Sequence, residues 1–156
     1  MKNTLAIILL VILSSCVTLT KQQQDNREAA INFLRGYKIS VAFKDMEWGG
    51  LAHYYSEHIK LSYKTLSYTK NIMWSVIIHE AAHIILYRQG KQKAIIKGYK
   101  AFVEREQQTD RYAKKLMLKR FPTMKYWGYY INASPEKLCD TYRKWLEDEE
   151  AECQKE

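Results

Sequence analysis

The stretch SVIIHEAAHIIL, residues 75–86, determines how the rest of this chain is arranged. Its apolar residues predict a helix, and on a helix His79 and His83 lie one above the other because they are four residues apart. Two imidazoles in these positions can share one metal ion, and Glu80 then lies beside that ion. The spacing therefore predicts a metal site with an adjacent general base.

The residues around this stretch predict that the helix is buried. We expect it to run from Lys70 to Gln89, with Thr69 as its N-cap and Gly90 as its end. Apolar residues lie on nearly all its sides, which is typical of a helix at the centre of a domain. A lone buried histidine is usually a hydrogen-bonded core residue. Two histidines and a glutamate are costly to bury unless they are paired or bound to a metal, so the pattern favours a metal site.

A zinc site with two histidines needs a third protein ligand and an open position, so an acidic residue is expected downstream. The candidates are Glu104, Glu106 and Asp110. Helical spacing places Glu106 and Asp110 on the apolar face of a second helix, whereas Glu104 falls on a face of lysines and arginine. Glu106 is therefore the predicted ligand.

The position of Glu106 along its helix also predicts where that helix begins. An antiparallel helix that starts near Tyr99 brings Glu106 level with His83, at a rise of about 1.5 Å per residue. A helix that started earlier would carry Glu106 past the histidine. We therefore predict irregular structure over residues 90–98.

The segment Glu106–Leu118, EQQTDRYAKKLML, resembles the E-x-E-A-[ND]-x-[FY]-A-x-x-L-L-M stretch of ImmA/IrrE-type and related minimal gluzincin peptidases. Gln108 and Thr109 depart from that pattern, where an acid and an alanine are common. The resemblance covers about residues 37–120. It implies an α+β, zincin-like fold, in which a small antiparallel or mixed sheet packs on the H-E-x-x-H helix and on the glutamate-bearing helix that follows.

The resemblance further implies the chemistry of the site. His79, His83 and Glu106 would bind one zinc ion, Glu80 would be the general base, and Asp110 would orient a ligand histidine. A peptide or protein substrate would lie extended along the sheet edge and be hydrolysed. Two alternatives stay open: a non-catalytic envelope lipoprotein of the binding or immunity type on the same scaffold, and a zinc amidase that acts on cell-wall cross-links.

Three short strands are predicted before the central helix. Alternating apolar and polar residues indicate strands over residues 37–44, 51–55 and 59–64, which we interpret as a small antiparallel sheet. Asp25 is the expected N-cap of a preceding helix that ends at Gly36.

Aromatic residues follow the second helix. Tyr126, Tyr129 and Tyr130 are of the kind that usually pack in a core, although one of them could reach the metal and stabilise an oxyanion. Ser134 and Pro135 predict the start of a last helix.

Two cysteines fall in this last segment. Cys139 and Cys153 are 14 residues apart, and a continuous helix would hold them about 21 Å apart. A bridge between them would require a break in that helix. We therefore interpret them as two thiols with no catalytic role.

The N-terminal residues predict export. Residues 1–15 hold one lysine and a short apolar run, which is typical of a signal peptide and too short to span a membrane. Residues 13–16, LSSC, resemble the lipobox of bacterial lipoproteins, which implies that Cys16 carries lipid. An ordinary secretory signal and an uncleaved anchor are the alternatives. Residues 16–26 are then a polar tether, and residues 27–156 form a single domain.

Length and charge limit the other options. A chain of 156 residues, 47% of them apolar, can form one domain with a core and has no room for two. The net charge of +8 attracts anionic surfaces without identifying them. No nucleic-acid-binding module is recognisable, so we expect no nucleic-acid partner. The predicted location is the bacterial cell envelope, on the periplasmic or outer-surface side, with lipid as the membrane contact.

Overall fold

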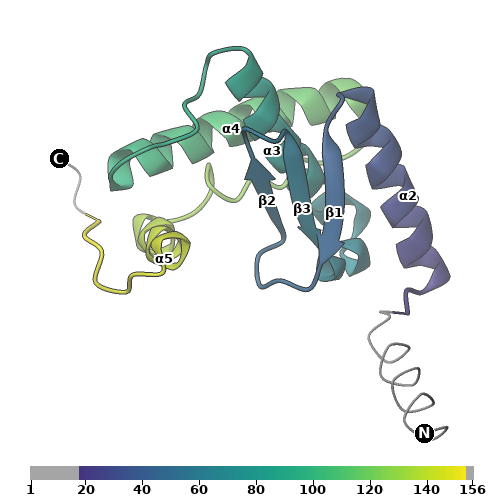
Figure 1. Cartoon of the computed structure of the whole chain (residues 1–156), viewed down its shortest axis with the longest axis horizontal. Coiled ribbons are helices and arrows are strands. Elements are labelled where there is room, and N and C mark those ends of the chain that lie inside the picture. The colour runs from purple at the N-terminus through teal and green to yellow at the C-terminus, as the bar shows by residue number, and fades with distance from the viewer. Residues whose placement is uncertain (1–17, 154–156) are drawn as a thin grey trace, which may run out of the picture.

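A computed structural model describes residues 18–153 of the chain, which form an α+β fold with a small sheet packed on helices (Figure 1). No helix among these residues is long and apolar enough to cross a membrane. The predicted signal peptide and Cys16 lie outside the described residues. In chain order the elements are α2 (Lys21–Gly36), β1 (Ser40–Lys44), β2 (Gly50–His53), β3 (His58–Ser62), the 3-10 helix η1 (Tyr63–Ser67), α3 (Lys70–Arg88), α4 (Tyr99–Arg120) and α5 (Pro135–Leu146).

The three strands form a mixed sheet in the order β1-β3-β2. Strand β3 runs antiparallel to β2 and parallel to β1, with Ser40 opposite His58. The antiparallel sheet inferred from the alternation is therefore wrong for one of the two strand pairs, whereas the mixed sheet that the resemblance allowed is the one observed. Alternation in the sequence shows which face of a strand is buried, but it does not specify the partner or direction of the strand. One consequence matters for the site: β2 is an edge strand.

Helix α2 begins earlier than predicted. Thr20 caps it, because its side chain accepts a hydrogen bond from the Gln23 backbone while the Gln23 side chain accepts one from the Thr20 backbone. The expected cap at Asp25 is therefore wrong. Part of the segment predicted as a tether, residues 16–26, belongs to this helix.

Helix α3 is the centre of the molecule, with the sheet on one side and α4 packed along it (Figure 1). It is buried on nearly all sides, as predicted. It ends at Arg88, one residue before the predicted end, and Gly90 then adopts a positive φ of 67°. The prediction that α4 begins at Tyr99 after an irregular segment is confirmed.

Arg88 fixes the end of α3 against two turns. Its guanidinium forms an ion pair with Glu57, which lies between β2 and β3. It also donates to the backbone carbonyls of Tyr37 and Lys38, between α2 and β1. One side chain thus connects the end of α3 to the turn between β2 and β3 and to the turn between α2 and β1.

Helix α5 is shorter than the segment predicted for it, and this corrects the interpretation of the cysteines. Glu147 adopts a left-handed conformation with a φ of 56°, and the chain turns back there. Cys139 and Cys153 form a disulfide, with their Cα atoms 5.5 Å apart. The predicted continuous helix fails because the acidic residues after Leu146 offer no apolar stripe to pack.

Loss of this disulfide should destabilise the fold. The bridge closes a loop of about 15 residues, and a loop of this size contributes about 3 kcal/mol to the free energy of unfolding. We expect the double variant Cys139→Ser/Cys153→Ser to unfold at lower denaturant concentration than the oxidised protein, by circular dichroism. The reduced wild type should match the variant. Equal midpoints for all three samples would contradict the bridge.

Candidate metal centre

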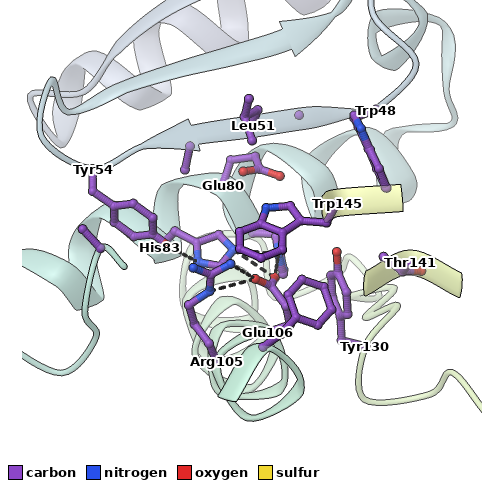
Figure 2. Close-up of a pocket in the computed structure, with 15 residues that line it drawn as sticks. Trp48, Leu51, Tyr54, Glu80, His83, Arg105, Glu106, Tyr130, Thr141 and Trp145 are labelled. Atoms are coloured by element: carbon purple, nitrogen blue, oxygen red, sulfur yellow. Dashed lines mark hydrogen bonds and ion pairs between the residues drawn. The ribbon is translucent and has the colours of Figure 1, made fainter. Parts of the chain in front are cut away.

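Three side chains from α3 and α4, those of His79, His83 and Glu106, meet with their polar atoms facing one another. Figure 2 labels His83 and Glu106. Nε2 of His79 lies 3.1 Å from Nε2 of His83. Oε2 of Glu106 lies 3.2 Å from the first of these nitrogens and 3.1 Å from the second. All three residues are buried, and we call them the metal triangle. Glu106 points inward and is level with His83, as predicted, whereas Glu104 is exposed.

The size of the metal triangle fits a tetrahedral metal ion. Zinc binds nitrogen and oxygen ligands at about 2.0–2.1 Å, which places two ligands of a tetrahedron about 3.3 Å apart. The three separations of 3.1–3.2 Å are close to this value. Within residues 18–153 no other group of histidine, cysteine and acidic side chains is arranged to hold a metal.

Asp110 fixes the orientation of the first histidine. Its Oδ1 lies 2.8 Å from Nδ1 of His79, and because a carboxylate only accepts, that nitrogen donates. Nε2 of the ring is then left to face the metal triangle. Asp110 also accepts hydrogen bonds from the Tyr126 hydroxyl and the Ile131 backbone, at 2.6 and 3.1 Å. The aspartate therefore lies where the sequence predicted it.

The second histidine is held by residues that the sequence did not identify. Nδ1 of His83 lies 3.3 Å from Oε1 of Gln92 and 3.1 Å from the Thr109 hydroxyl. The Gln92 amide group donates to Thr109 and to the Arg105 carbonyl, so its oxygen is the atom that faces the ring. The Tyr54 hydroxyl lies 3.0 Å from the same nitrogen. Gln92 belongs to an irregular segment, where no sequence pattern marks it.

The metal triangle stabilises positive charge. Burial lowers the pKa of His79, but its hydrogen bonds to Asp110 and Glu106 outweigh burial and raise that pKa to about 10. Burial raises the pKa of Glu106, but His83 and His79 outweigh it and hold that pKa well below its usual range. The carboxylate therefore keeps its charge. Arg105 pairs with one of its oxygens, and the other faces the histidines, where a proton on an imidazole or a metal ion in its place can sit. The donor set therefore fits a divalent cation.

Glu80 lies beside the metal triangle, against the edge strand. A Cβ atom at Gly50 would come within 2.6 Å of Cγ of Glu80, so only glycine leaves room for this side chain. The carboxylate also has a hydrogen bond with the Ala52 backbone, while its burial raises its pKa. Glu80 and the metal triangle together line a cavity of about 200 Å³. The carboxylate thus faces the same space as the metal triangle.

The three candidate tyrosines have different positions. Tyr126 uses its hydroxyl on the aspartate described above, and Tyr129 uses its hydroxyl on helix α5. Tyr130 stacks on His79, with 5.3 Å between the ring centroids, and lines the cavity of the metal triangle. Within residues 18–153 its hydroxyl makes no hydrogen bond. Of the three, Tyr130 is therefore best placed to meet a bound molecule.

A second cavity of about 340 Å³ adjoins the first and lies between α3 and residues 126–130. Both are lined by His79 and Glu80, so together they form one cleft across the metal triangle. Trp48, Trp127 and Trp145 border this cleft and are 37%, 56% and 39% exposed. Large aromatic side chains exposed around one opening indicate a binding surface.

Comparisons of the chain with protein-family models, with curated proteins and with solved structures find no match. The resemblance to minimal gluzincins therefore rests on the motifs around His79 and Glu106. The geometry of the metal triangle and the cleft carries the functional argument.

Alanine substitution of each glutamate of α4 should show which of the two binds the metal. We expect Glu106→Ala to lose most of the bound zinc, because two histidines alone leave the site without a charged ligand. Glu104→Ala should keep it, since Glu104 is exposed and lies outside the metal triangle. Zinc content per chain, measured on the purified proteins, provides the test. Equal loss in both variants, or no loss in the first, would contradict the ligand assignment.

Proposed function

We propose that this chain is a zinc metallopeptidase of the minimal gluzincin type, exported and anchored at the bacterial cell envelope by lipid on Cys16. One observation carries the proposal: the metal triangle opens on a cavity that Glu80 also lines. Structural zinc sites are closed by four protein ligands, whereas catalytic sites have three and leave a position for water or substrate. Three ligands and an open side fit the catalytic class.

The side chains of the cleft would divide the work of hydrolysis. Zinc, when bound, supplies Lewis acidity that polarises the scissile carbonyl and favours deprotonation of water. Glu80 accepts the proton of the attacking water and passes it to the leaving amine, so that a C–O bond forms as the C–N bond breaks. Asp110 accepts the hydrogen bond of Nδ1 of His79, so that a bound zinc ion would take the place of the proton on Nε2.

Tyr130 is a candidate for stabilising the oxyanion. Burial raises the pKa of its hydroxyl well above the usual range, so the group keeps its proton and can donate. A donor aimed at the negative charge that develops on the carbonyl oxygen lowers the barrier. Its place on the wall of the cavity supports this role.

The edge strand supports a peptide as the substrate. Strand β2 borders the cleft and has only one neighbour, β3, in the sheet. An extended peptide can add to such an edge through backbone hydrogen bonds. The tryptophans at the opening suit apolar side chains of that peptide.

The disulfide supports export. Disulfides persist in oxidising compartments and are rare where thiols are kept reduced. The bridge between Cys139 and Cys153 accounts for two of the three cysteines. Cys16 is the remaining thiol, and it stands at the lipobox-like position.

Substitution of the general base tests the enzyme assignment. Glu80→Gln keeps the shape of the side chain but cannot accept the proton. We expect zinc content and folding to stay nearly unchanged while peptide cleavage falls by about 10²- to 10⁴-fold. A digest of a broad peptide library by the wild type and the variant measures this effect.

Other outcomes of the same digest distinguish the alternatives. A non-catalytic lipoprotein would cleave nothing in wild-type form, and Glu80→Gln would leave its biological activity intact. Cleavage of cell-wall cross-links with no cleavage of library peptides would identify an amidase. Either result would overturn the peptidase.

The anchor has a separate test. Cys16→Ser should abolish lipid labelling and release the protein from the membrane fraction, because the lipid on Cys16 is the proposed membrane contact. Fractionation after a high-salt wash is the measurement. A variant that stays with the membrane would show that the lipobox interpretation is wrong or that a second anchor exists.

A further inference from the structure

Arg105 is a buried cation in contact with the metal triangle (Figure 2). Its Nε and Nη2 atoms donate to Oε1 of Glu106, at 3.0 and 2.9 Å. The other oxygen of that carboxylate, Oε2, faces the two histidines. The two oxygens of Glu106 therefore have separate partners, the arginine for one and the metal triangle for the other.

Aromatic residues from two other elements hold the guanidinium in place. Its carbon lies 5.4 Å from the ring centroid of Trp145 on α5, and 5.8 Å from that of Tyr54, which follows β2. Arg105 and Glu106 are neighbours on a helix, where consecutive side chains point in different directions. Contact between their charged groups therefore depends on the packing of the guanidinium against the rings of Tyr54 and Trp145. A buried arginine is rare unless it is paired, and here its partner is a metal ligand.

We propose that Arg105 is a positioning residue that restricts Glu106 to a single metal-facing oxygen. A carboxylate with both oxygens free can bind one ion through both, as glutamate does with Ca²⁺. That mode raises the coordination number and suits ions that prefer many oxygen ligands, such as Mn²⁺. Two N–H groups on Oε1 oppose it and favour four-coordinate zinc. This inference rests on the proposed metal site and concerns which ion that site selects.

A measurement of metal selectivity distinguishes an effect of Arg105 on the coordination of Glu106 from an effect of its positive charge on metal affinity. Arg105→Met removes the positive charge beside the ion, which favours any divalent cation to a similar extent. The ratio of zinc affinity to manganese affinity cancels that effect and reports on the coordination of Glu106. The absorption of the cobalt-substituted protein is a second readout, because its intensity depends on coordination number. Arg111→Met is the matched control, since Arg111 is an exposed arginine on the same helix.

We expect the zinc-to-manganese affinity ratio to fall about 10-fold or more in Arg105→Met, the size typical of a lost partner of a metal ligand. The visible absorption of the cobalt form should weaken at the same time. Arg105→Lys keeps the charge but offers one point donor in place of two fixed N–H groups, so its ratio should fall as well. Arg111→Met should match the wild type. If Arg105→Met does not fold by circular dichroism, Arg105→Lys carries the test.

An unchanged ratio and an unchanged cobalt spectrum in both Arg105 variants would overturn the inference. A raised KM with unchanged metal properties would assign Arg105 to substrate binding in its place. Failure of the wild type to bind zinc at all would instead overturn the proposed function. The two failures are therefore distinguishable.

Discussion

Two imidazole nitrogens and a carboxylate oxygen are held 3.1–3.2 Å apart between α3 and α4, and the surrounding structure depends on balancing the charge there. Each ligand is held from its far side by a different polar partner: Asp110, Gln92 or Arg105. These partners come from α4 and from the segment before it. Such a network stabilises the fold only when every member is satisfied, and the three atoms that face one another have room for a proton or a metal ion between them.

The edge of the sheet borders the cavity beside the metal triangle. Because β3 lies between the other two strands, β2 is left at the edge, next to the end of Glu80. Gly50 lets the carboxylate approach the strand closely, so Glu80, the proposed general base, and the edge strand border the same cavity. On the other wall, α5 contributes Trp145, and the disulfide fastens the segment after that helix. The sheet edge, helix α5 and Glu80 therefore all border the same cleft.

Local patterns predicted the centre of this fold well and its surroundings poorly. Helical periodicity and the rise per residue placed Glu106 beside His83, because both depend only on positions along regular helices. The parallel pairing of β1 and β3 and the bridge to Cys139 depend on contacts distant in sequence, which periodicity does not encode. Arg105 gave no signal, since arginine is usually exposed and only the folded chain shows its aromatic walls.

The energetics of the α3–α4 contact argue for function over packing. Well-packed apolar residues of similar volume are often as stabilising as a buried ionic group, or more so. This contact instead buries Glu106, Asp110 and Arg105 beside two histidines, and each charge needs its own partner. A closed structural site could justify that cost, but this one borders a cavity. Glu80 is not part of the metal triangle, yet the glycine at position 50 makes room for its carboxylate. A carboxylate held beside a metal site without being a ligand is what proton transfer requires.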